Sequence, residues 1–226
     1  MQNENDTRRK ECGMEIAVRL ENLSKSFKEE KVLKGITHSF EKGKIHGIMG
    51  FNGSGKTVMF KCICGFLKPD GGAVWVDGRQ IGKDVDFPES VGMIIESPGF
   101  LPGLSGFANL KRLAALKRLI TDEEVRESIR RVGLDPDSKK KVGQYSLGMR
   151  ERLGIAQAIM EDPELLILDE PFNGLDKRGA EEVCALFDEI RGRGKTILVA
   201  AHNMLEIEYL CDTISEMDAG VLTRMK

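Results

Sequence analysis

The sequence has few aromatic residues and almost no imbalance of charge. Its 226 residues include one Trp, two Tyr and ten Phe, so aromatic residues make up 6% of the chain. The 34 Lys and Arg residues nearly balance the 36 Asp and Glu residues, which gives a formal net charge of −2. So even a balance argues against a surface that coats nucleic acid, and we expect no nucleic-acid partner. With 41% hydrophobic and 31% charged residues, the composition is that of a globular protein and not of a disordered chain.

The sequence also lacks a long apolar run. A helix needs roughly 18 to 20 apolar residues to cross a bilayer, and the best run, residues 165–168, stops at Asp169. Residues 1–14 are polar and charged and no apolar segment follows them, so they do not resemble a secretion signal. We therefore expect a flexible tail over residues 1–14, with Met14 as a second candidate start, and a cytoplasmic location.

The five Cys residues are scattered and odd in number, which is typical of a protein kept in a reducing compartment. Cys62 and Cys64 lie two positions apart in a segment that we predict to be helical. Side chains at this spacing point to different faces of a helix, so we do not expect this pair to bind a metal.

The first part of the chain is expected to form mainly strands. Alternation of apolar and polar residues between Glu15 and Phe40 predicts antiparallel strands joined by a charged turn at 28–31. The predicted elements that follow are a strand at 45–49, a helix at 58–67 that closes before a turn at 70–72, and strands at 73–76 and 91–95.

The middle of the chain changes to helical spacing, and strands alternate with helices after Pro163. Thr121 and Glu124 form a capping-box pattern, and Gly133 is the expected stop of that helix. The predicted elements are helices at 107–119 and 121–132, a strand at 165–168, a helix at 177–191, a strand at 196–201 and a helix at 204–211. We therefore predict an α/β fold over 15–226, with a mixed sheet core, an N-terminal antiparallel β region and an inserted helical subdomain at about 97–163.

Residues 50–57 read GFNGSGKT and match the phosphate-loop pattern Gly-x4-Gly-Lys-Ser/Thr. Glycines let backbone N–H groups approach phosphate oxygens, Lys56 supplies a positive charge, and Thr57 supplies a hydroxyl for Mg²⁺. The other interpretation, a glycine-rich turn between a strand and a helix, is disfavoured because the motif stands where a phosphate loop requires it. The residues expected to bind nucleotide here are Gly50, Asn52, Gly53, Ser54, Gly55, Lys56, Thr57 and Val58.

Two adjacent acids, Asp169 and Glu170, follow the apolar run 165–168. Successive strand residues point to opposite sides, so the two acids are expected to act differently. One serves the Mg²⁺ ligand shell, and the other orients and deprotonates water; alternatively, both merely cap a strand end. His202 follows the predicted strand 196–201, where ligands gather in open α/β sheets, so it is a candidate contact for the γ-phosphate or else a surface histidine. We expect His38 and His46 to be structural.

Taken together, these motifs and the segment Tyr145-Ser146-Leu147-Gly148-Met149 resemble the ATPase subunits of ABC transporters, over about residues 15–213. The resemblance implies a P-loop NTPase of the ABC type that binds ATP and Mg²⁺. It also implies a second ATPase subunit, as a head-to-tail homodimer in the ATP state, and a separately encoded integral-membrane permease. The protein would then lie peripherally on the cytoplasmic face of the membrane. Ser146 caps a helix whose N–H groups offer a second seat for an anion.

The resemblance also assigns roles by position. Phe27 would stack on adenine, and Thr57 and Asp169 would bind Mg²⁺. Three residues would take part in catalysis: Glu170 as the hydrolytic base, His202 as the γ-phosphate switch and Lys56 as a phosphate contact. Ser146 and Gly148 would contact the partner's ATP, and Asp176 would communicate across the dimer.

The sequence departs from the usual family pattern in three places. Glu96 stands where glutamine is usual and is expected to bring a carboxylate to the Mg²⁺ site. Val58 replaces a hydroxyl residue, and Leu147 and Met149 replace commoner Gly and Gln. The segments 96–100 and 145–149 resemble the branch of bacitracin-resistance, lantibiotic-immunity and drug-export ATPases. Phe100, Leu101 and Leu104 are expected either to seat a helix of the permease or to pack the helical subdomain.

The leading hypothesis is an ATP-hydrolysing motor, in which ATP-driven dimer closure powers a separate permease that exports an antimicrobial peptide or drug. The alternative is a soluble ABC-family ATPase not coupled to transport, which uses the same residues. The sequence has no coiled-coil insert, tandem second cassette or basic tail, which favours the motor. A metabolic kinase or GTPase is disfavoured because no Asn-Lys-x-Asp guanine-reading motif is present.

Overall fold

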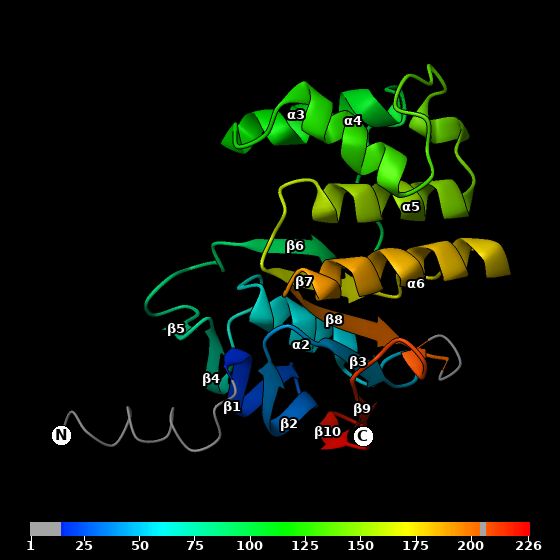
Figure 1. The fold of residues 1–226 in the computed structure, drawn as a ribbon. Coiled ribbons are helices and arrows are strands. Elements are labelled where there is room, and N and C mark those ends of the chain that lie inside the picture. Colours follow the sequence, from blue (N-terminus) through cyan, green and yellow to red (C-terminus); the bar gives the residue numbers. More distant parts are fainter. Residues whose placement is uncertain (1–14, 204–206) are drawn as a thin grey trace.

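The computed structural model describes residues 15–203 and 207–226, which form two β-sheets with a group of helices above them (Figure 1). The predicted tail at 1–14 lies outside the described residues, as do residues 204–206 of the last predicted helix. Residues 208–210 of that helix form a turn instead. Among the described residues, no helix is both long and apolar enough to span a bilayer.

The N-terminal antiparallel sheet has the strand order β2-β1-β4-β5, as the sequence pattern predicted for its first strands. Its strands are β1 (Ile16–Phe27), β2 (Glu30–Glu41), β4 (Gly71–Val76) and β5 (Arg79–Gln80). Gly71 and Gly72, which we predicted as a turn, begin β4 because they pair with the bulged part of β1 near Ser24. Val18, Leu20 and Leu33 are fully buried on the inner face of the sheet.

The second sheet has the order β10-β9-β3-β8-β7-β6 and is parallel except for β10. Its strands are β3 (Ile45–Met49), β6 (Val91–Ile94), β7 (Leu165–Asp169), β8 (Thr196–Ala201), β9 (Thr213–Asp218) and β10 (Val221–Arg224). Every residue of β7 and β8 is buried, because both faces of a parallel sheet are covered. The sequence analysis missed the β9–β10 hairpin, whose turn at Ala219-Gly220 has positive φ at both residues.

The parallel sheet separates two hydrophobic cores. Leu165 and Ile167 of β7 face a core shared with the antiparallel sheet and helix α2 (Lys56–Ile63), which lies between the two sheets (Figure 1). Leu166 and Leu168 face a core shared with α6 (Lys177–Gly192) and the upper helices. The strand that ends in Asp169-Glu170 is therefore fixed by packing on both sides.

Helix α2 is shorter at its carboxyl end than the predicted 58–67. It ends at Ile63, and Gly65 then adopts φ +81°. A Cβ at Gly65 would lie 2.2 Å from the Asp86 carbonyl oxygen. The close approach of a distant loop, which local sequence does not reveal, therefore sets the end of this helix.

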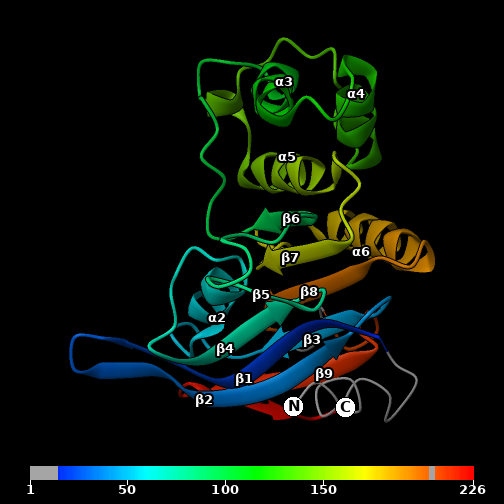
Figure 2. The ribbon, with the colours of Figure 1, turned by 90° about the vertical axis from the view of Figure 1, so that its left-hand side faces the viewer.

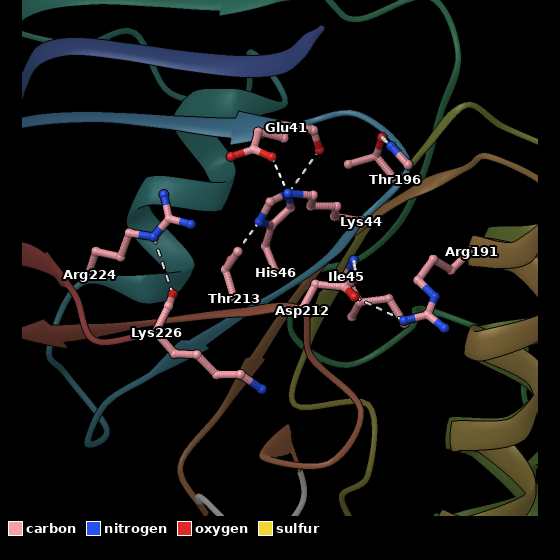
Figure 3. Close-up of polar contacts among 11 residues, drawn as sticks. Glu41, Lys44, Ile45, His46, Arg191, Thr196, Asp212, Thr213, Arg224 and Lys226 are labelled. Atoms are coloured by element: carbon pink, nitrogen blue, oxygen red, sulfur yellow. Dashed lines mark hydrogen bonds and ion pairs between the residues drawn. The ribbon is translucent and has the colours of Figure 1, made fainter. Parts of the chain in front are cut away.

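Strand β3, which leads into the phosphate loop, is held by polar contacts around its start (Figure 3). Asp212 accepts a hydrogen bond from the Ile45 amide at 2.8 Å and pairs with Arg191 at 3.0 Å. His46 is buried, with Nε2 2.8 Å from the Glu41 carbonyl oxygen and Nδ1 2.7 Å from Thr213 Oγ1. A carbonyl only accepts, so Nε2 carries the proton and His46 ties β3 to β2 and β9.

The upper helices are α3 (Gly106–Lys117), α4 (Asp122–Arg131) and α5 (Leu147–Ile159), of which α5 lies between the other two and β6 (Figures 1 and 2). As predicted, Thr121 and Glu124 form a capping box at the start of α4, and Gly133 follows its end with φ +74°. All three helices fall within 97–163, the stretch that we propose as a subdomain.

Candidate active site

The phosphate loop connects β3 to α2, at the carboxyl edge of the parallel sheet. A Cβ at Gly50 would lie 2.4 Å from the Met217 carbonyl oxygen, so this position requires glycine. Gly55 is the N-cap of α2 with φ +115°, and no side chain caps the helix. The first N–H groups of α2 therefore have no side-chain acceptor, which is the arrangement that binds an anion.

Two buried side chains of the loop also fit a bound phosphate. Lys56 is 5% exposed, and its Nζ donates to the carbonyl oxygen of Gly50 at 2.5 Å and of Phe51 at 3.3 Å. Ser54 Oγ is buried and has no hydrogen-bond partner among the residues that the structure describes. A buried hydroxyl without a partner is costly, and a phosphate oxygen in the loop would satisfy it.

Thr57 and Asp169 form the oxygen pair of the site. Thr57 Oγ1 donates to Asp169 Oδ2 at 2.5 Å. Burial raises the pKa of the Asp169 carboxyl, the hydrogen bond from Thr57 opposes this rise, and the negative charge of Glu170 adds to it. A divalent cation would favour the ionised carboxylate. The described residues contain no group of three or more His, Cys, Asp or Glu side chains placed for a metal, so Mg²⁺ here would need phosphate and water ligands as well.

Glu170 lies between a lysine and a histidine. It follows β7 directly and has φ +54°. Its Oε1 lies 3.4 Å from Lys56 Nζ, and its Oε2 lies 2.7 Å from His202 Nδ1. The Glu170 amide donates to the carbonyl oxygen of Ala200 on β8 at 3.0 Å, which fixes the backbone. Asp169 points to Thr57 while Glu170 points to His202, so the two acids lie in different environments.

These residues surround a cavity of about 560 Å³. Phe27, at the end of β1, is 44% exposed and forms part of its wall. The lining residues are Phe27, Val32, Phe51, Asn52, Gly53, Gly55, Lys56, Thr57, Val58, Glu96, Ser97, Glu151, Asp169, Glu170 and Asn173. Sequence reasoning missed Val32, Phe51, Ser97, Glu151 and Asn173. Phe51 lies inside the phosphate-loop motif and could have been found there, but the other four become neighbours only through the fold.

Glu96 lines the cavity, but its carboxylate does not contact the Thr57–Asp169 pair. Its Oε1 pairs instead with Lys61 Nζ at 2.6 Å, and the side chain is 64% exposed. Sequence reasoning missed Lys61 because it belongs to no motif, although it follows Thr57 by one helical turn.

The residues expected to act across the dimer, Ser146, Gly148 and Asp176, do not line this cavity. Ser146 caps α5, with its Oγ accepting from the Met149 amide at 3.2 Å. A Cβ at Gly148 would lie 2.6 Å from the Gly174 carbonyl oxygen, so α5 packs closely on the loop after β7. Asp176 caps α6 by accepting from the Gly179 amide at 2.8 Å. Each of these roles lies within one chain, and none of the three residues reaches the chain's own nucleotide cavity.

A phosphate loop between a parallel strand and a helix, with an Asp-Glu pair at the end of a nearby strand, defines a P-loop nucleotide hydrolase. The chain belongs to the ABC transporter family, whose model matches residues 33–173. It is an ATP-binding ATPase of this family, and the predicted fold and family are thereby confirmed.

Three curated relatives are similar over most of this chain. ABC transporter ATP-binding protein YybJ of Bacillus subtilis is 43% identical over 89% of this chain and 92% of its own. Bacitracin transport ATP-binding protein BcrA of Enterococcus faecalis is 41% identical over 92% of this chain and 68% of its own. Lantibiotic transport ATP-binding protein SrtF of Streptococcus pyogenes is 33% identical over 90% of this chain and 87% of its own.

Solved structures are also similar. CbiO1 from Clostridium perfringens, part of the ABC transporter complex cbiONQ, has a TM-score of 0.79 and 28% identity over 92% of this chain and 87% of its own. The ATP-binding cassette MJ0796, in a dimeric post-hydrolysis state bound to ADP and phosphate, has a TM-score of 0.84 and 23% identity over 92% of this chain and 98% of its own. The similarity to MJ0796 supports the fold of this chain.

Proposed function

We propose that this chain is the motor of a transporter that exports an antimicrobial peptide or drug, with ATP bound between two copies of the chain and hydrolysed at Glu170. The observation that carries this proposal is the position of the Glu170 carboxylate, between Lys56 and His202 at the wall of the phosphate-loop cavity. The names of BcrA and SrtF, which refer to bacitracin and lantibiotic transport, support the substrate class.

The residues of the cavity can divide the work of hydrolysis. The loop N–H groups and Lys56 hold the phosphates, and Phe27 stacks on the base. Thr57 and Asp169 would hold Mg²⁺, which neutralises charge on the phosphates. Glu170 takes a proton from water as the water oxygen bonds to the γ-phosphorus and the bond to the leaving ADP oxygen breaks. His202 holds the second oxygen of Glu170 and so fixes the direction of the base.

A second copy completes the site in this proposal. Ser146 and Gly148 lie at the start of α5, away from the cavity of their own chain, and Leu147 beside them is 50% exposed. Asp176 lies at the end of the loop on which Gly148 packs. A contact made by residues 145–149 of one copy therefore acts on this loop in the same copy. The dimeric state of MJ0796, which has the same fold, supports a dimer here as well.

An apolar surface beside the cavity is our candidate seat for the permease. Phe66 and Phe87 are 51% and 56% exposed, with ring centroids 6.2 Å apart. Phe66 also lines a cavity of about 200 Å³ together with Met93 and Pro98. Phe100 packs against the subdomain core, as one of our two expectations had it, whereas Leu101 is 48% exposed. Exposed aromatic residues next to a hollow are typical of a binding surface, and we propose that the protein meets the cytoplasmic face of the membrane here.

Replacing Glu170 with Gln tests the proposal. Gln keeps the shape but cannot accept the proton, so we expect ATP turnover to fall by about 10²-fold or more while ATP binding persists. With ATP, the variant should run as a dimer in light scattering after size exclusion. Glu181→Gln, an exposed change on α6, is the matched control and should leave both measurements unchanged. Near-normal turnover in Glu170→Gln would refute the assigned base, and a persistent monomer with saturating ATP would refute the shared site.

A further inference from the structure

Lys61 belongs to no motif, but it lies on the same helix as Thr57, one of the two proposed Mg²⁺ ligands. It follows Thr57 by four residues on α2, so both side chains leave the same face of the helix. Thr57 Oγ1 reaches Asp169, and Lys61 Nζ reaches Glu96 Oε1 at 2.6 Å. Glu96 has φ +60° and lies two residues after the end of β6, at the same sheet edge as Asp169.

The carboxylate of Glu96 adds negative charge to a cavity that must accept a triphosphate. Among the described residues, four acids line this cavity, namely Glu96, Glu151, Asp169 and Glu170, whereas Lys56 is the only Lys or Arg of that lining. A released Glu96 carboxylate would be a hard oxygen ligand that competes with phosphate and water for Mg²⁺.

We propose that Lys61 is a positioning residue that holds the Glu96 carboxylate outside the ligand shell of the metal at Thr57 and Asp169. This inference rests on the proposed nucleotide and metal site. Lys61 thereby allows a glutamate at this position, because the charge of Glu96 is balanced by its ion pair with Lys61. Loss of Lys61 frees Glu96 to bind the metal, which strengthens metal binding and slows turnover.

Mn²⁺ binding to the ADP complex, followed by electron paramagnetic resonance, tests this role without relying on activity. An ion pair as exposed as Lys61–Glu96 contributes at most about 1 kcal/mol, which corresponds to a change of roughly two- to fivefold. We expect Lys61→Met to lower the Mn²⁺ concentration at half saturation by this factor. Lys61→Arg, which keeps the charge, should restore the wild-type value.

A double-mutant cycle separates the proposed role from a general loss of positive charge. If Lys61 acts through Glu96, then Lys61→Met should have no effect on Mn²⁺ binding in a Glu96→Gln background. The exposed Lys83→Met is the matched control and should change nothing in either background. An equal shift from Lys61→Met in both backgrounds, or no shift in either, would overturn the inference. Absence of nucleotide-dependent Mn²⁺ binding in the wild type would instead refute the proposed site.

Discussion

Helices α2 and α5 both begin at a predicted ATP-binding motif, but their first turns are built in opposite ways. The N-cap of α2 is Gly55, which offers no side-chain cap, and the first residue of the helix, Lys56, is buried. The N-cap of α5 is Ser146, whose hydroxyl accepts from the Met149 amide, and the first residue of the helix, Leu147, is half exposed. The first turn of α2 therefore lacks a side-chain cap inside its own cavity, whereas the first turn of α5 has one amide capped by Ser146 and begins at a half-exposed residue.

This difference indicates what each motif needs from a ligand. The α2 end gains further hydrogen bonds and a further negative partner for Lys56 when an anion enters the loop, so its residues should govern nucleotide affinity in a single chain. The α5 end is stable without a ligand, so it can be presented to another molecule. Changes at α2 should accordingly alter binding, and changes at α5 should alter turnover more than binding.

The largest expected effect on ATP affinity comes from Lys56→Met, which removes the buried cation of the α2 end. A hydrogen bond to a charged group is worth about 1.5–3 kcal/mol, so we expect ATP affinity to fall about 10- to 100-fold in isothermal titration calorimetry. The control is Lys42→Met, which removes a lysine paired with Asp77 on the antiparallel sheet. Unchanged affinity in Lys56→Met would show that the loop backbone alone holds the phosphates.

The next effect concerns two serines that cap helices of the upper layer. Ser105 caps α3 and Ser146 caps α5, each with its Oγ 3.2 Å from the capped amide. Either change to Ala should reduce the free energy of unfolding by about 1 kcal/mol in urea titrations. Ser146→Ala alone should also lower ATP turnover by roughly tenfold, because the proposed dimer loses the hydroxyl that we place at the partner's nucleotide. Equal turnover in the two variants would leave Ser146 with only its capping role.

Local signals in the sequence predicted the elements on which this comparison rests. The bounds of β3 and β8 agree with the predicted strands, because short apolar runs between turn residues define buried strands well. The capping box at Thr121 and Glu124 is equally local. The turn pattern Ala219-Gly220 between the apolar positions of β9 and β10 was a usable local signal that the sequence analysis overlooked.

The rest of the site depends on contacts between distant segments. Lys61 and Glu96 are 35 residues apart, and only the packing of α2 beside β6 brings them together. The expectation that Glu96 joins the metal follows from its position in the motif, but that position does not specify the neighbouring cation. Glu151 was missed for the same reason, since it lines the cavity only because α5 packs against the segment after β6.

The last expected effect concerns Glu151, acts on stability, and sharpens the contrast between the two helices. It is 7% exposed on α5, and burial raises its pKa from 4.5 to about 7, against an opposing effect from Arg150. The unfolded chain loses this proton near pH 4.5 and the folded chain keeps it to about pH 7, so the folded state binds more protons in that window. The free energy of unfolding should therefore fall as pH rises from 4.5 to 7. Glu151→Gln removes this cost, so at pH 8 it should be more stable than wild type by about 3 kcal/mol, with little difference near pH 4.5.

Urea titrations of both proteins at several pH values would measure this difference. Glu181→Gln, on the exposed face of α6, is the control, and its offset from wild type should stay constant with pH. Lys56 is a buried cation with three oxygen neighbours at the α2 end, whereas Glu151 at the α5 end owes its altered pKa mainly to burial. A pH-independent offset for Glu151→Gln would mean that the Glu151 carboxylate ionises normally in the folded protein. The contrast between the helices would then lie in their caps alone.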